Sequence, residues 1–141
     1  MNTKVLLATL AAGIVAFFFG WLVFGILLAD FYTANTTVYE GLVKTPPNFL
    51  MIFISNLCMA FLIAYIFNRW AGIKTAGEGA QAGLIIGGLV ALTYDLFLYA
   101  TMNLFTPTII AVDIIGNGVF GAIVGAIVGL VLGTGKKVVS V

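Results

Sequence analysis

Apolar residues form four long runs along the chain, and the segments between the runs carry most of the polar side chains. The runs cover residues 5–29, 49–67, 80–102 and 108–132. Each holds about 20 residues or more, which is the length that an α-helix needs to cross a bilayer core of about 30 Å. The pattern predicts an all-α protein, a four-transmembrane-helix bundle in which residues 1–141 form a single integral membrane domain.

Prolines mark the starts of two of these runs. Pro46 and Pro47 precede the second run, and Pro107 precedes the fourth. Proline suits the first turn of a helix, because its missing N–H would have no partner there. Thr106 is predicted to cap the fourth helix. The first run follows Lys4 and is longer than the apolar part of a signal peptide, so we interpret it as a retained helix.

Composition supports a membrane protein and narrows its chemistry. Hydrophobic residues make up 62% of the chain and charged residues 8%, which is too little polar surface to cover a water-soluble globule. The chain has no histidine, and its single cysteine, Cys58, lies in the second run. A disulfide framework, a cysteine or histidine metal site and imidazole acid–base chemistry are therefore not expected. We expect no cofactor, no metal, no catalytic residues and no enzymatic activity.

The distribution of basic residues predicts the orientation of the chain. Only Lys44 lies in the connection between the first two runs, residues 30–48, which is expected to be a loop. The other basic residues lie near the two termini or between the second and third runs: Lys4, Arg69, Lys74, Lys136 and Lys137. Because basic residues beside membrane helices stay in the cytoplasm, both termini are predicted to be cytoplasmic and residues 30–48 to lie outside.

Small residues recur at every fourth position in the last two runs. Helices in a bilayer pack closely where small residues face each other, so the two stripes favour an antiparallel helix pair. An oligomer interface is the alternative use of such a stripe. The glycines concerned are Gly79, Gly83 and Gly87 in the third run, and Gly121, Gly125, Gly129 and Gly133 in the fourth.

The same four-residue spacing leads each stripe to an acidic residue, Asp95 in the third run and Asp113 in the fourth. An ionised carboxylate inside a bilayer costs several kcal/mol, so such residues are usually paired or functional. The two acids lie at similar depths, and asparagines and tyrosines accompany them. We therefore predict an ion or polar-ligand site made of Asp95, Asp113, Asn56, Asn117, Tyr94 and Tyr99.

A short similarity between the second and fourth runs predicts an internal repeat. Ile54-Ser55-Asn56 is followed by alanines at four-residue spacing, and Ile115-Gly116-Asn117 is followed by glycines at the same spacing. Two runs that derive from one helix would make the protein two tandem helical hairpins with the same orientation in the membrane.

The two acids allow three physical outcomes. They can be protonated and hydrogen-bonded, they can share one proton, or they can hold a hard cation. The leading hypothesis is a proton- or cation-linked transporter or channel subunit. The alternatives are a non-catalytic structural or accessory subunit of a membrane complex, and a protein that binds lipid or small amphiphiles. The expected partners are membrane lipids and further copies or other membrane subunits, with no nucleic acid.

The sequence resembles a family of small four-helix bacterial membrane proteins that form a domain of unknown function. The resemblance rests on Gly20-Trp21-Leu22-Val23-Phe24-Gly25, on Asp30-Phe31-Tyr32 and on the glycine-rich last run. It implies a location in the bacterial inner membrane and no particular activity. Gly116-Asn117-Gly118 is similar to part of fluoride channels, but the arginine-bearing motif of their first helix is missing. Small multidrug exporters carry a glutamate in the first span, which this chain lacks.

Overall fold

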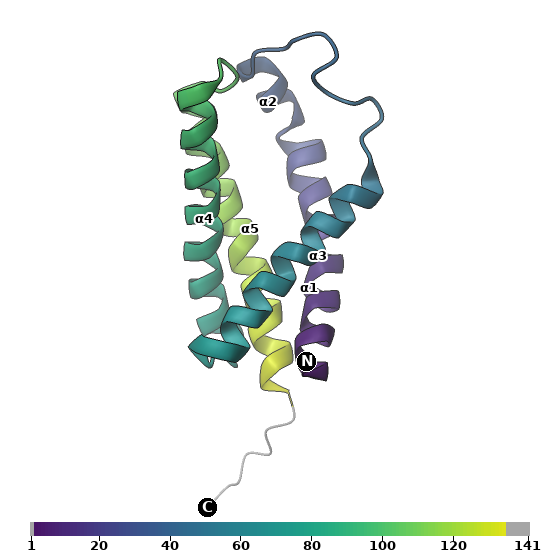
Figure 1. The fold of residues 1–141 in the computed structure, drawn as a ribbon, viewed down its shortest axis with the longest axis vertical. Coiled ribbons are helices and arrows are strands. Elements are labelled where there is room, and N and C mark those ends of the chain that lie inside the picture. The colour runs from purple at the N-terminus through teal and green to yellow at the C-terminus, as the bar shows by residue number, and fades with distance from the viewer. Residues whose placement is uncertain (1, 135–141) are drawn as a thin grey trace, which may run out of the picture.

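The computed structural model describes residues 2–134, so Lys136 and Lys137 lie outside the described residues. Helices make up most of the described chain (Figure 1), which has no strand and a single isolated β-bridge between Thr36 and Phe105. A π-helical segment, Val23–Leu27, extends the first helix, and a second one, Phe67–Ala71, extends the third. The five α-helices are α1 Thr3–Leu22, α2 Ala29–Asn35, α3 Phe49–Ile66, α4 Ala76–Thr101 and α5 Pro107–Gly133.

Four of the helical segments are long and apolar enough to cross a membrane. They are Thr3–Leu27, Phe49–Ala71, Ala76–Thr101 and Pro107–Gly133. Their bounds fall close to the four apolar runs, so the prediction of four long apolar helices is confirmed. The segments bury only a minority of their residues inside the chain, as expected for helices of a multi-pass membrane protein whose outer surfaces face lipid.

Residues 30–48, which connect the first two spans, were expected to form a loop, but the first part of this connection is helical. The helix bends at Leu28, and the chain then forms α2 over Ala29–Asn35 before it becomes irregular. Asp30 lies in the first turn of α2, where its negative charge interacts favourably with the helix dipole. Polar residues here end the apolar run without ending the helix, which is why the apolar pattern alone missed α2.

Side-chain caps define where the later helices begin. Thr106 accepts a hydrogen bond from the backbone N–H of Ile109 at 3.3 Å, and Pro107 occupies the first turn of α5, as predicted. Asn48 caps α3 in the same way by accepting from Met51 at 3.2 Å. These caps satisfy N–H groups that have no partner within the helix.

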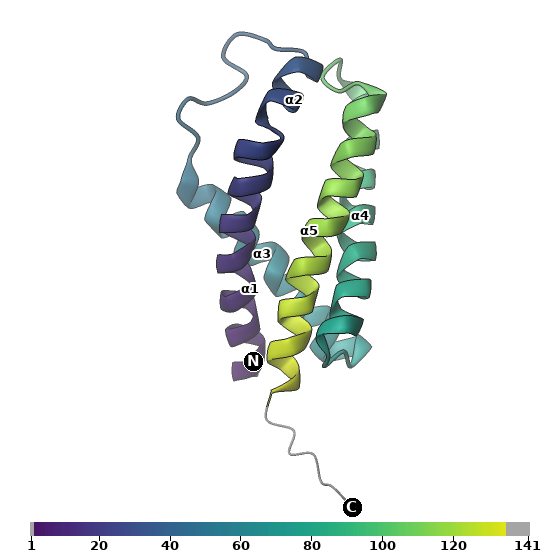
Figure 2. The same cartoon turned by 180° about the vertical axis from the view of Figure 1, so that it is seen from behind.

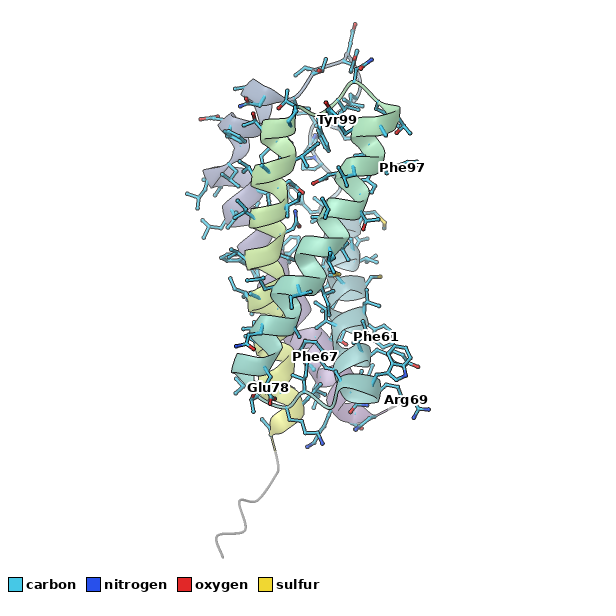
Figure 3. The ribbon with its side chains drawn as sticks, turned by 90° about the vertical axis from the view of Figure 1, so that its left-hand side faces the viewer. Phe61, Phe67, Arg69, Glu78, Phe97 and Tyr99 are labelled. Atoms are coloured by element: carbon cyan, nitrogen blue, oxygen red, sulfur yellow. The ribbon has the colours of Figure 1, made fainter. Side chains whose placement is uncertain are left out.

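The helices form two neighbouring pairs. Helices α4 and α5 run side by side and antiparallel, whereas α3 crosses obliquely beside α1 (Figures 1 and 2). The start of α1 and the end of α5 lie at one end of the molecule, where the Lys4 ammonium donates to the carbonyl oxygen of Thr134. Arg69 lies at this end too (Figure 3). We call it the Lys4 end.

The opposite end is formed by the connection after α2 and by the turn between α4 and α5. The backbone N–H of Thr37 donates to the carbonyl oxygen of Leu104 at 3.1 Å, and the Tyr39 hydroxyl donates to that of Asn103 at 3.4 Å. These bonds hold the connection of residues 36–48, which carries Lys44, against the α4–α5 turn. We call this the Leu104 end.

Glycines let the backbones of α4 and α5 touch along a seam. A Cβ atom added to Gly83 would lie 2.1 Å from the carbonyl oxygen of Gly121, and one added to Gly79 would lie 2.1 Å from that of Gly125. Because no side chain fits at such distances, the stripes face each other within one chain. The seam fixes the spacing and register of the two helices.

The hydrophobic core occupies the half of the molecule near the Lys4 end. It is built from the inner faces of α1, α3 and α5, with small residues on α1 that admit the larger ones of its neighbours. Phe67, the first residue of the π-helical segment after α3, lies toward the Lys4 end (Figure 3) and is fully buried. The core residues include Val5, Ala8, Ala12, Ala16, Ala60, Ile63, Ala64, Val124, Val128 and Leu132. This half is therefore closely packed.

Candidate functional site

Asp95 and Asp113 meet between α4 and α5, where the glycine seam ends. The Asp95 side chain is 2% exposed, and its carboxyl group lies within hydrogen-bonding range of the Asp113 carboxyl group. One Asp95 oxygen, Oδ2, is buried with no hydrogen-bond partner among the described residues. The stripe that ends in Asp95 and the one that leads to Asp113 thus bring the two predicted acids together.

Two donors hold the Asp113 carboxyl group. The Tyr32 hydroxyl from α2 donates to Oδ1. The Asn117 amide donates to Oδ2 at 2.7 Å and to the Asp113 main-chain carbonyl at 3.0 Å. Both oxygens of Asp113 are therefore occupied, in contrast to the buried oxygen of Asp95.

Tyr32 is a residue of this cluster that the sequence analysis did not include. Burial of the phenol raises the pKa of Tyr32 above its usual value, and the hydrogen bond to Asp113 and the nearby carboxyl charges act in the same direction. Its partner lies 81 positions away, on another element. No spacing along the chain could have indicated this contact.

A pocket of about 450 Å³ lies between α1, α3 and α5, beside the carboxyl pair. Three polar side chains, Ser55, Asn56 and Asn117, contribute to its wall. The two predicted asparagines therefore line one pocket. Pro47 and Phe49, which precede and open α3, line it as well. The rest of the wall is mainly aromatic: Phe17, Trp21, Phe24 and Phe120.

Asn117 is the residue that joins the pocket to the carboxyl pair. It lines the pocket and donates to Asp113. Asn56 plays a different part, because its amide donates to the Ile52 carbonyl of its own helix at 2.9 Å. Of the two asparagines, Asn117 alone is bonded to the acids.

The structure does not bring Tyr94 and Tyr99 into the cluster. Their side chains are 63% and 50% exposed, and neither donates a hydrogen bond to a described residue. Tyr94 lies with Phe97 along a shallow groove on the outside of α4, and Figure 3 shows Tyr99 near the Leu104 end of the same helix. Tyr94 directly precedes Asp95 in the sequence, and a one-residue step along a helix turns a side chain by about 100° to another face.

Within residues 2–134, no group of three or more histidine, cysteine, aspartate or glutamate side chains is placed to hold a metal ion. The polar atoms near the pair are instead two carboxyl groups, a phenol and an amide. No known protein family, curated protein or solved structure matches the chain.

Proposed function

We propose that the protein is a small proton-translocating membrane protein, a transporter or channel subunit in which Asp95 and Asp113 hold the transported proton. The observation that supports this proposal is the pairing of two carboxyl groups within apolar spans. Two negative charges at hydrogen-bonding distance repel strongly where the dielectric constant is low, so such a pair holds one shared proton. Acidic residues within membrane helices commonly serve proton relays.

The hydrogen bonds suggest how the proton is distributed. Asp113 accepts from Tyr32 and Asn117, which suits an ionised carboxylate. Asp95 accepts no such bond and is nearly fully buried, which suits the protonated partner. In this arrangement Asp95 donates its proton to Asp113, and the pair carries one negative charge.

The packing around the pair favours access from one end. The pocket extends from Pro47 and Phe49 to Asn117, which is bonded to Asp113. In the other direction the glycine seam and the hydrophobic core fill the space toward the Lys4 end. A proton would enter from the pocket, and its passage onward would require the α4–α5 pair to move relative to α1 and α3.

A structural or accessory subunit is the second candidate, and the bonds among Tyr32, Asp113 and Asn117 favour it. A purely structural network, however, should satisfy each of its buried polar atoms. The buried Asp95 oxygen Oδ2 receives no hydrogen bond from a described donor, so this carboxyl group depends on a proton shared with Asp113.

We further propose that the Lys4 end faces the cytoplasm of a bacterial cell, with the protein in the inner membrane. Lys4, Arg69 and Lys74 belong to this end, whereas Lys44 belongs to the opposite one. Basic side chains beside membrane helices favour the cytoplasmic side and contact anionic lipids. Contacts with lipids and with further copies of the chain complete this proposal, which follows the family that the sequence resembles.

Proton flux through reconstituted vesicles tests the proposed function. Vesicles with a trapped pH indicator would receive an imposed proton gradient, with potassium and valinomycin to compensate charge. The wild-type protein should acidify the interior faster than Asp95→Asn, and Asp30→Asn should match the wild type because Asp30 is an exposed acid of α2. If wild-type vesicles hold the gradient as long as protein-free vesicles do, the structural candidate is preferred.

A further inference from the structure

The polar side chains of the α1–α3–α5 pocket have used most of their donors elsewhere. Both N–H groups of Asn117 are taken by Asp113. One N–H of Asn56 and the hydroxyl hydrogen of Ser55 go to the carbonyl oxygen of Ile52, at 2.9 and 2.8 Å. The orientation of each amide is determined, because its partners are oxygens that can only accept. What these residues still offer a ligand is chiefly acceptor oxygens.

The electrostatic surroundings of the pocket favour a positive charge. No residue of its wall is ionisable. Asp113 lies directly behind Asn117 and faces Asp95 from α4 and Tyr32 from α2, so the nearby ionisable groups are two acids and a phenol. Faces of the aromatic rings that line the pocket attract cations as well.

We propose that this pocket binds a small hydrophobic amine in its ammonium form. Its hydrocarbon part would lie among Phe17, Trp21 and Phe24, and its N–H groups would donate to the Asn117 and Asn56 oxygens. A volume of about 450 Å³ suits a molecule of that size, and aromatic walls with a few placed polar groups are typical of small-molecule sites. A carboxylate of the same shape would find few donors and would face the acid pair.

A second part of the inference rests on the proposed function. Asn117 lines the pocket and donates to Asp113. A positively charged ammonium group bound beside Asn117 therefore favours the protonation state of the carboxyl pair that has the fewest protons. Binding should therefore release a proton from the carboxyl pair. This exchange would make the ammonium ion and the proton alternate at neighbouring sites.

Trp21 reports on the pocket directly. The second tryptophan, Trp70, lies at the far end of α3 and is 71% exposed, so Trp70→Phe leaves one reporter. This variant in zwitterionic nanodiscs would be titrated with phenylbutylamine, phenylbutanol and phenylbutanoate, which share one hydrocarbon body. We expect the amine to bind at least about tenfold more tightly than the alcohol, as for a hydrogen bond to a charged group, and the carboxylate to bind most weakly.

A matched pair of substitutions locates the binding. Ser55→Phe fills the pocket from an exposed position and should weaken amine binding about tenfold or more, whereas Thr93→Phe, on the outside of α4, should leave it unchanged. Equal affinities of the three probes for the Trp70→Phe reporter would overturn the proposal before any pocket residue is replaced. An equal loss of amine affinity in Ser55→Phe and Thr93→Phe would also overturn it.

Proton release separates this inference from the proposed function. In weakly buffered solution the amine should release up to one proton per protein, and Asp95→Asn should bind the amine without releasing it. Selective binding without release in the wild type would support the pocket and contradict the exchange. If the carboxyl pair titrates and the protein conducts protons, but none of the three probes binds in the pocket, the amine-binding inference is overturned. The proposed function then stands.

Discussion

The Asp95 carboxyl group lies within hydrogen-bonding range of the Asp113 carboxyl group, just beyond the last close contact of the glycine seam. That contact joins Gly87 to Asn117, where an added Cβ would lie 2.3 Å from the Asn117 carbonyl oxygen. The seam therefore sets the distance between the helices that carry the acids. Asn117 therefore takes part in helix packing through its carbonyl oxygen and in the polar cluster through its side-chain amide.

A methyl group in the seam should destabilise the protein. Gly83→Ala places a Cβ 2.1 Å from the Gly121 carbonyl oxygen, so α4 and α5 must separate, and we expect a loss of roughly 1–3 kcal/mol in the free energy of unfolding. Gly88→Ala is the matched control, because nothing lies within 4 Å of its added Cβ. Better helix propensity should make that variant about as stable as the wild type or more so. Unfolding in mixed detergents measures both, and equal effects would contradict the seam.

The two asparagines should differ when each is replaced by leucine. Asn117→Leu removes the donor to Asp113 Oδ2 and leaves that oxygen without its partner, which should cost about 1–3 kcal/mol of stability. Asn56→Leu removes a bond within α3 only, so its effect should be clearly smaller. The same unfolding measurement compares them. A larger loss for Asn56→Leu would show that the amide of Asn117 does not hold the pair.

Tyr32 should make stability depend on alkaline pH. Burial chiefly, together with Asp113, raises the pKa of Tyr32 in the folded protein above that of an unfolded tyrosine, about 10. Its contribution is complete below that pH, where both states are neutral, and is lost as the pH rises because the unfolded phenol ionises first. Tyr32→Phe should lack this part of the decline. Melting curves across alkaline pH test it, and parallel curves for the two proteins would contradict a buried, bonded phenol.

The sequence predicted the spans well because each depends on local composition. Apolar length placed the four long helices, Thr106 with Pro107 placed the start of α5, and four-residue spacing identified the residues of the seam. The same spacing predicted that Asp95 and Asp113 lie at the same level along the helix pair, because both residues continue stripes whose register the glycines determine.

What the sequence missed depends on contacts between distant elements. Tyr32 reaches Asp113 because α2 continues beyond the bend at Leu28, and nothing in its own neighbourhood indicates this. The pocket depends on the oblique course of α3, which apolar periodicity does not determine. Tyr94 was included because it adjoins Asp95 in sequence, yet it lies on another face of α4.

Infrared spectroscopy of the carboxyl groups tests the central claim most directly. Between mildly acidic and mildly alkaline pH, the lipid-reconstituted wild type should show a protonated carboxyl band that titrates, and Asp95→Asn should lose it. Asp30→Asn should keep it, since Asp30 is an exposed residue of α2. A carboxyl pair that is fully ionised at neutral pH, or a band that survives unchanged in Asp95→Asn, would contradict a shared, exchangeable proton between Asp95 and Asp113.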